Sequence, residues 1–353
     1  MKHLRNFKDF ESLVTEKILT VKVGDEVIGN VDNSKTIGFN KFMTRLKSSV
    51  SSIALETFLP SYLLGKKLSG SELSFAESRI VQAYQNLPSP FQTDVLINTL
   101  KSGQIPINDL INSKDWLNEI SSSFGGLPLE FILDIFNIYG KPGSAAIGKG
   151  EFMLLFFSEL ESAKSKDLQS KDGTIYEVKD NGNKDSGFRV GSQGKSAREA
   201  IKLLNTASPN FNYDIKLSFN AGTKGKGISL GKILLDATAA TVLDYGKFAK
   251  SFLTFEKSYD KKVDDVTAKV LKANDLKLFR QYLGALQLWG YMKAEKIANV
   301  IFFNRKGNIP KNIGLIVYNK NFSTFFNSNK DNILVTGWEN DGRNMSFRIK
   351  YIS

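Results

Sequence analysis

Two acidic residues and a lysine are spaced for chemistry in one short stretch of the chain. Asp167 lies ten residues before Glu177, and Lys179 follows Glu177 by two. Two carboxylates that meet at one point repel each other unless a cation joins them, and their hard oxygen atoms suit Mg²⁺ or Mn²⁺. A lysine beside such a metal could orient or activate a water. The stretch therefore predicts a metal site held by carboxylates.

The residues around these side chains predict a β-hairpin. The runs from Lys166 to Ser170 and from Thr174 to Lys179 have the composition of short strands, and Asp172-Gly173 between them is typical of a turn. Side chains two apart on a strand share a face, so Glu177 and Lys179 point the same way. Asp167 can lie opposite them on the paired strand.

Asp172 competes with Asp167 for the role of first acid, because it lies only five residues before Glu177. We favour Asp167, since Asp172 followed by glycine is more typical of a turn than of a strand.

The segments on either side extend this pattern. Gly148 to Glu151 opens the apolar run Phe152 to Phe157, which predicts a buried helix that brings the carboxylate of Glu151 toward the same point. After the hairpin, Phe188 to Ser192 can form a third strand, and Ser196 to Leu204 has the apolar spacing of an amphipathic helix.

This order of glycine, Glu on a helix, Asp on a strand and Glu-x-Lys on the next strand resembles the PD-(D/E)XK nuclease superfamily, which has the restriction-endonuclease-like fold. The resemblance covers residues 141 to 205. It implies metal-dependent hydrolysis of DNA phosphodiester bonds, with Asp167 and Glu177 as metal ligands, Lys179 near the attacking water and Glu151 as an accessory acid. Lys166 stands where the family pattern has proline.

Basic and polar residues beyond the hairpin are candidates for contacts with the nucleic acid. Arg189, Gln193 and Lys195 fall close enough in sequence to reach a scissile phosphate. Lys224 and Lys226 lie in a glycine-rich basic stretch whose amides and lysines could touch a DNA backbone, although a plain surface loop is the alternative.

Composition limits the choice of chemistry. The chain has 353 residues, a formal net charge of +12, no cysteine and a single histidine, His3. Thiolate sites, Ser-His-Asp triads and histidine-based metal sites are thereby excluded. The positive charge favours DNA as a partner, with an anionic membrane second. No run of about 18 apolar residues is present, and the N-terminus lacks a secretory signal, so we expect a soluble protein without a membrane partner.

A nucleotide-binding loop is an alternative use of the glycines at residues 143–150. The stretch has the G-x-x-x-x-G-K spacing of a P-loop, but Gly150 stands where a Ser or Thr hydroxyl would bind Mg²⁺. A nucleotide-driven motor is disfavoured for that reason.

Two regions are expected along the chain. Residues 1–140 predict a helical N-terminal region, because apolar residues recur at helical spacing and prolines separate the segments. Residues 141–353 predict the nuclease-like core, with a helical insertion at about 228–297. The expected helices are 5–19, 39–59, 71–87, 91–100, 107–124 and 127–139, and strand-like runs return at 299–303, 314–318, 333–336 and 345–349.

The combined prediction is an α+β protein with a mixed sheet flanked by helices. The expected function is that of a nuclease acting on DNA with Mg²⁺ or Mn²⁺. The alternative is a non-catalytic DNA-binding or virion structural protein of a bacteriophage. The expected location is the cytoplasm of a bacterial host cell or a virion, and the further partners considered are a second copy of the chain and virion proteins.

Overall fold

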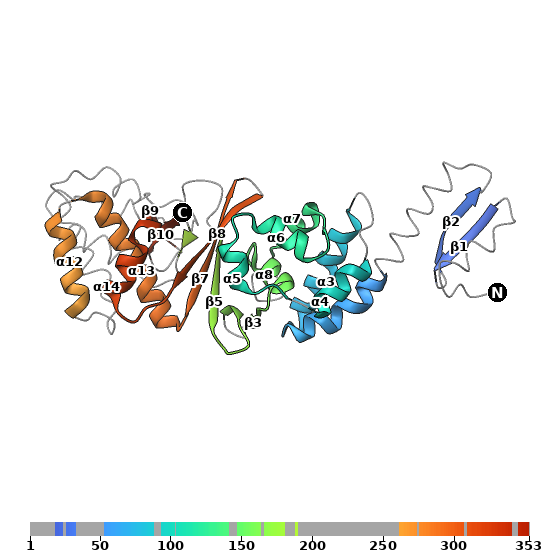
Figure 1. Ribbon diagram of the computed structural model, residues 1–353, viewed down its shortest axis with the longest axis horizontal. Coiled ribbons are helices and arrows are strands. Elements are labelled where there is room, and N and C mark those ends of the chain that lie inside the picture. Colours follow the sequence, from blue (N-terminus) through green and yellow to red (C-terminus); the bar gives the residue numbers. More distant parts are fainter. Residues whose placement is uncertain are drawn as a thin grey trace. The chain divides into compact units, whose positions relative to one another are not determined.

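The computed structural model of this chain describes residues 18–23, 26–32, 53–87, 93–102, 104–140, 147–163, 166–180, 188–189, 261–273, 275–306, 309–340 and 345–352. The chain divides into two compact units. The first unit comprises Met1–Gln104 and Ile120–Ile135, and the second comprises Ile105–Glu119 and Phe136–Ser353. Helices and strands occur together, and a mixed five-stranded sheet is flanked by helices, which confirms the α+β class (Figure 1).

Helices predominate among the described residues of the first unit. A helix over residues 53–65 is followed by α3 (Gly70–Gln85), α4 (Thr93–Ser102) and α7 (Leu129–Phe136). Buried residues recur every three or four positions, as a helix with one apolar face requires. In α3 these are Ala76, Ile80, Ala83 and Tyr84. The helices predicted at 71–87 and 91–100 are confirmed.

A β-hairpin in the first unit was not predicted. Strands β1 (Ile18–Val23) and β2 (Glu26–Asp32) pair antiparallel. The helix expected over residues 5–19 is therefore wrong at its end, where Ile18 and Leu19 belong to β1. Both strands are rich in valine and isoleucine, whose branched side chains favour extended backbone.

The single helix expected over residues 107–124 is two helices, α5 (Ile107–Asn112) and α6 (Trp116–Ser123). The carboxylate of Asp115 explains the break, because it accepts a hydrogen bond from the amide of Asn118 at 3.3 Å and so satisfies the first turn of α6. The hydroxyl of Ser113 in turn accepts from the amide of Asp115 at 3.2 Å.

A five-stranded sheet is the centre of the second unit, in the order β3-β4-β5-β7-β8. Neighbouring strands run antiparallel except β5 and β7, which are parallel. A parallel pair needs a crossover connection, and α13 (Leu276–Glu295) precedes β7 directly. The strands are β3 (Glu161–Ala163), β4 (Lys166–Gln169), β5 (Ile175–Asp180), β7 (Asn299–Lys306) and β8 (Ile309–Val317).

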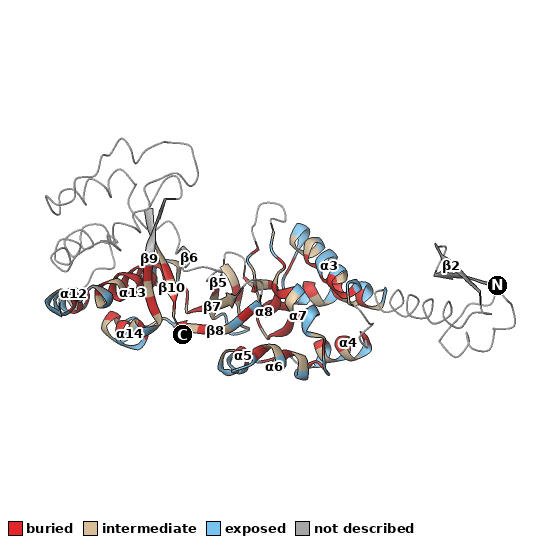
Figure 2. Cartoon of the chain, turned by 90° about the horizontal axis from the view of Figure 1, so that it is seen from above, coloured by how far each residue is buried: buried red, intermediate tan, exposed pale blue. Residues whose placement is uncertain are grey.

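Alternate residues of β7 are buried on opposite faces of this sheet. Val300 and Phe302 join the apolar cluster that includes the buried residues of α13. Phe303 points the other way, and its ring centroid lies 5.1 Å from that of Phe136 and 6.1 Å from that of Trp116. The sheet is thus covered on both faces, with α13 on one and α8 (Glu151–Phe157) on the other (Figures 1 and 2).

A second sheet, in the order β6-β10-β9, corrects one prediction. Strand β6 (Phe188–Arg189) pairs with β10 (Met345–Tyr351), which also pairs with β9 (Ile333–Asn340). The strand expected at Phe188–Ser192 therefore does not continue the hairpin of the first sheet. Two further helices, α12 (Lys261–Ala273) and α14 (Phe322–Asn329), and a short 3₁₀ helix, η2 (Lys330–Asn332), complete the described part of this unit.

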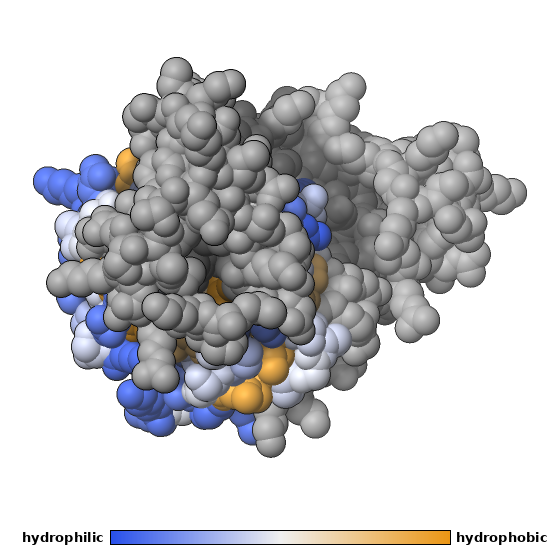
Figure 3. Space-filling view, turned by 90° about the vertical axis from the view of Figure 1, so that its right-hand side faces the viewer, coloured by the Kyte–Doolittle hydropathy of each residue, from blue (hydrophilic) through white to orange (hydrophobic). Residues whose placement is uncertain are grey.

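The helical insertion expected at about 228–297 agrees with α12 and α13, and its first part lies outside the described residues, as does the helix expected over 196–204. None of the helices in the described residues is both long and apolar enough to span a bilayer. On the face drawn in Figure 3, the described surface is largely hydrophilic and hydrophobic residues are exposed in small groups.

Candidate active site

The predicted hairpin is present as β4 and β5, joined by a tight turn. Leu168 pairs with Tyr176 and Gln169 with Ile175. Gly173 has a φ of 85°, a backbone conformation that glycine adopts without strain. Asp172 lies exposed in this turn, and hydrogen bonds from Ser170 and from Thr174 lower the pKa of its carboxyl to about 2. Its hydrogen bonds thus serve the turn.

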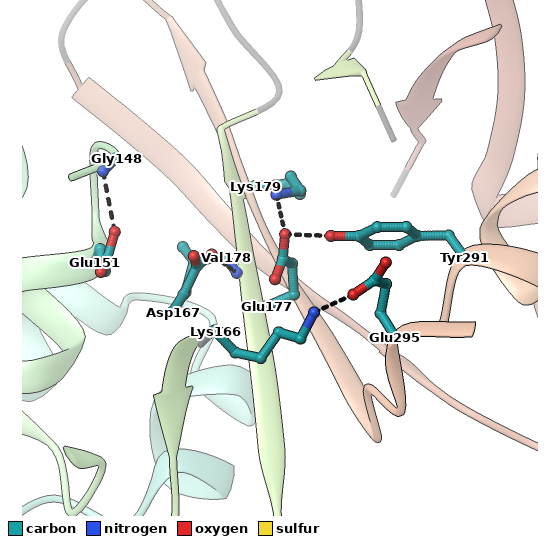
Figure 4. Close-up of polar contacts among 9 residues, drawn as sticks. All are labelled: Gly148, Glu151, Lys166, Asp167, Glu177, Val178, Lys179, Tyr291 and Glu295. Carbon is teal, nitrogen blue, oxygen red and sulfur yellow. Dashed lines mark hydrogen bonds and ion pairs between the residues drawn. The ribbon is translucent and has the colours of Figure 1, made fainter. Parts of the chain in front are cut away.

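Asp167 lies at the point where β4 and β5 stop pairing. The amide of Val178 donates a hydrogen bond to Oδ2 of Asp167 at 2.7 Å, so a side chain takes the place of a backbone acceptor there (Figure 4). This bond fixes the carboxylate beside β5.

Glu177 is held from two sides. Its Oε1 forms an ion pair with Nζ of Lys179, two residues along the same face of β5. The same oxygen accepts a hydrogen bond from the hydroxyl of Tyr291 on α13 at 2.7 Å (Figure 4). Glu177 is only 6% exposed, so these two donors offset the cost of burying its charge.

Glu151 reaches the site from the first turn of α8. Its Oε2 accepts a hydrogen bond from the amide of Gly148 at 3.0 Å. Gly150, directly before it, has a φ of 82°, and a Cβ there would lie 2.5 Å from the ring of Phe303. Only glycine fits this backbone and this close approach, so the entry into α8, and with it the position of Glu151, depends on Gly150.

Burial and mutual repulsion set the electrostatics of the acids. Burial and then the charge of Asp167 raise the pKa of Glu151 to about 8, with a smaller effect from Glu177. Burial and then the charge of Glu177 raise the pKa of Asp167 above its usual range. Lys179 opposes both shifts. The negative charges of the three acids therefore repel one another, and a bound cation would relieve this repulsion.

Each of the three carboxylates has one oxygen engaged and one available. In the described part of the chain, Oδ1 of Asp167, Oε2 of Glu177 and Oε1 of Glu151 accept no hydrogen bond. Among the same residues, no three acidic or histidine side chains gather closely enough to hold a metal by themselves. A pair of carboxylates nevertheless fits Mg²⁺, which takes one or two carboxylates and completes its shell with waters and phosphate oxygens.

The other candidate residues do not gather at this site. One lies in the second sheet, and four lie outside the described residues. Arg189 is in β6, which follows the hairpin in the chain as expected but belongs to the second sheet, where Arg189 pairs with Arg348 of β10. Gln193, Lys195, Lys224 and Lys226 lie outside the described residues. Lys166, at the position of the family proline, forms an ion pair with Glu295 on α13.

The P-loop alternative is not supported by the described residues of its stretch. The carboxylate of Glu151 accepts the amide of Gly148, where a P-loop would present amides to a phosphate. Nζ of Lys149 donates to Oδ1 of Asn137 at 3.0 Å. The positive φ at residue 150 and its close contact with Phe303 require glycine, so a Ser or Thr hydroxyl cannot stand at that position.

Tyr291 is the site residue that sequence reasoning missed. It is buried, lies 114 positions from Glu177 in the chain, and reaches it because α13 crosses over the sheet to β7. An aromatic residue inside an apolar helix gives no local signal of such a role. The role of its hydroxyl follows only from the crossover that places α13 against the sheet.

Comparison with known proteins gives no relative: no family model, curated protein or solved structure matches the chain.

Proposed function

We propose that this chain is a metal-dependent nuclease that hydrolyses DNA phosphodiester bonds, of the PD-(D/E)XK type that its sequence resembles. One observation carries the proposal. Asp167 of β4 and Glu177 of β5 meet beside Lys179 and Glu151, and each acid keeps an oxygen without a hydrogen bond among the described residues. Buried acids are rarely brought together in this way without a cation to bind.

The order of elements also supports the proposal. The resemblance implies a helix followed by three strands and a helix, and in the described residues α8 is followed by the strands β3, β4 and β5. β3 lies before the hairpin, whereas the third strand was expected after it, and the helix expected over 196–204 lies outside the described residues. On its other side, β5 pairs with β7 in parallel, so the strand that carries Glu177 and Lys179 is an inner strand of the sheet.

The residues of the chain divide the work as follows. Asp167 and Glu177 would hold Mg²⁺ or Mn²⁺, because carboxylate oxygens are the ligands that these ions prefer. A bound ion would offset charge on the scissile phosphate and lower the pKa of the attacking water. Lys179 can donate to that water or to a phosphate oxygen once the ion takes over its partner Glu177. Tyr291 keeps the carboxylate of Glu177 oriented.

Cleavage assays test the proposal directly. Purified full-length protein is incubated with supercoiled plasmid, linear duplex and single-stranded DNA, in Mg²⁺, in Mn²⁺ and in chelator. We expect nicking or degradation with metal and none with chelator. Glu177→Gln removes the charge and preserves the shape of the side chain, so it should abolish cleavage and leave the fold intact.

Absence of cleavage of every DNA form under both metals would overturn the nuclease proposal. DNA retardation that is independent of divalent metal and falls steeply with salt would then favour the alternative, a DNA-binding or virion structural protein.

A further inference from the structure

A group of charged residues lies at the end of β5 and near the start of α8. Asp180 follows Lys179 directly, and both of its carboxylate oxygens accept hydrogen bonds from Nε of Arg305 on β7, at 2.7 and 2.9 Å. Lys149 lies two residues before Glu151. After burial, the charge of Arg305 is the main factor that lowers the pKa of Lys149, and Asp180 opposes it. Among the described residues, Lys149, Arg305 and Asp180 are therefore close enough to act on one another electrostatically, and Lys149 is near Glu151 in the chain.

An exposed tyrosine completes this group. Tyr139 is 65% exposed, and Nζ of Lys149 lies 5.3 Å from the centroid of its ring. The backbone next to Tyr139 is anchored, because Gly140 exchanges two backbone hydrogen bonds with Ile147, at 3.2 and 2.8 Å. Lys149 is further anchored by its bond to Asn137. A large aromatic surface is thus offered to solvent beside a cation that is already oriented.

Cations beside an exposed aromatic ring are the combination that binds single-stranded nucleic acid. Lysine contacts the phosphates, and the ring provides a platform on which a base can stack. A base inside a duplex is stacked between its neighbours and cannot reach such a ring, whereas phosphates are available in both forms. An exposed ring can therefore distinguish unpaired from paired nucleotides, whereas a lysine alone cannot.

We propose that Tyr139 and Lys149, with the charge of Arg305, form a subsite that receives an unpaired nucleotide of DNA next to the scissile phosphate. The base stacks on Tyr139 and its phosphate contacts Lys149. The inference rests on the proposed nuclease function, because it names the kind of strand that enters the site.

Binding without turnover tests the subsite separately from cleavage. Fluorescence anisotropy in chelator is measured for the full-length protein with a labelled single strand, a blunt duplex of the same sequence, and a strand of equal length in which every nucleotide is abasic. The abasic strand keeps the phosphates and removes the bases. We expect the single strand to bind more tightly than the abasic strand.

The variants assign the difference to individual side chains. Tyr139→Ala should weaken binding of the single strand by about five- to a hundred-fold, and should leave the duplex and abasic strands unchanged. Tyr139→Trp should retain tight binding, because its ring also stacks. Lys149→Gln should reduce the salt dependence of single-strand binding by about 0.7 in log–log slope, the loss of one phosphate contact. Lys320→Gln, which removes an exposed lysine near the opposite end of β7, is the matched control and should change neither.

The outcomes separate the subsite from the nuclease proposal. Equal binding of the single strand by the parent protein and Tyr139→Ala would overturn the subsite, even if the protein cleaves DNA. Loss of base-dependent binding in Tyr139→Ala supports the subsite. If the same protein cleaves no DNA with Mg²⁺ or Mn²⁺, the nuclease proposal fails and the unpaired-nucleotide site remains as the property of a DNA-binding protein.

Discussion

The carboxylate of Asp167 accepts a hydrogen bond from the backbone amide of Val178 at 2.7 Å, where β4 and β5 part. A backbone amide that would otherwise need a partner strand is thus satisfied by an acidic side chain. Because Val178 lies between Glu177 and Lys179, the bond ties the first acid to the strand that carries the other two site residues.

We predict that Asp167→Asn abolishes metal-dependent cleavage without unfolding the protein. The amide oxygen of asparagine can still accept the hydrogen bond from Val178, so the strand geometry is kept, but the negative charge needed to hold the metal is lost. Cleavage rates in Mg²⁺ and thermal melts measure the two effects. Asp172→Asn is the matched control, since Asp172 serves the exposed turn. An active Asp167→Asn with an inactive Asp172→Asn would show that the assignment of the two acids is reversed.

We predict that Tyr291→Phe weakens metal binding. Loss of the hydroxyl removes a donor to Oε1 of Glu177, and residues that orient a metal ligand in this way contribute about ten-fold or more to metal affinity. Titration of Mn²⁺ followed by calorimetry measures this effect without any assay of turnover. Tyr318→Phe is the control, because the hydroxyl of Tyr318 makes no hydrogen bond in the described part of the chain. Equal Mn²⁺ affinity in Tyr291→Phe and the parent protein would contradict the role given to Tyr291.

The parts of the fold that sequence reasoning predicted are those with local causes. The hairpin follows from two extended runs around Asp172-Gly173, and the positive φ of Gly173 is the turn that this pair favours. The buried helix α8 follows from an unbroken apolar run, Phe152–Phe157, every residue of which is buried. In both cases the signal and the structure lie within about ten residues of each other.

The parts that were missed depend on contacts far apart in the chain or on competing local signals. Phe188 was expected in a third strand of the same core as the hairpin, but it pairs with Ile349 of the second sheet, more than 150 positions away, and no local pattern encodes that choice. The contribution of α13 to the site depends on the parallel pairing of β5 with β7 in the same way. The hairpin β1–β2 has local signals, since its strands are rich in β-branched residues, but the helical spacing of the preceding residues runs into the first of them.

We predict that Lys179→Ala reduces single-turnover cleavage by orders of magnitude and also destabilises the metal-free protein. Glu177 is buried, and without Lys179 the hydrogen bond from Tyr291 is the one contact to its charge that remains among the described residues. Leaving a buried charge without its ion pair costs about 1–3 kcal/mol. Saturating Mn²⁺ should restore the stability but not the rate. The ion supplies the positive charge that Glu177 has lost, but it does not replace the Nζ donor of Lys179. Urea unfolding with and without Mn²⁺ measures this.

Two further variants separate the charge of Lys179 from its geometry. Lys179→Arg should restore most of the stability and not the full rate, since its planar donors lie elsewhere. Lys171→Ala, in the exposed turn of the same hairpin, should change neither quantity. Unchanged single-turnover rates in both Lys179 variants would leave it as a structural partner of Glu177 alone.

We predict that the stability of the metal-free protein falls as pH rises from about 5 to about 8, and that Glu151 causes much of this fall. The pKa of Glu151 is about 8 in the folded chain and has its usual value, near 4.5, in the unfolded chain. Between these values the folded state holds a proton that the unfolded state has lost, so raising the pH favours unfolding. Thermal melts in chelator across this pH range measure the effect. Glu151→Gln, which stays neutral, should flatten the profile, whereas Glu56→Gln, at an exposed position of the first unit, should leave it unchanged. A profile of the same slope in Glu151→Gln and the parent protein would mean that Glu151 is already ionised in the folded state, and that its repulsion by Asp167 is too weak to need a metal.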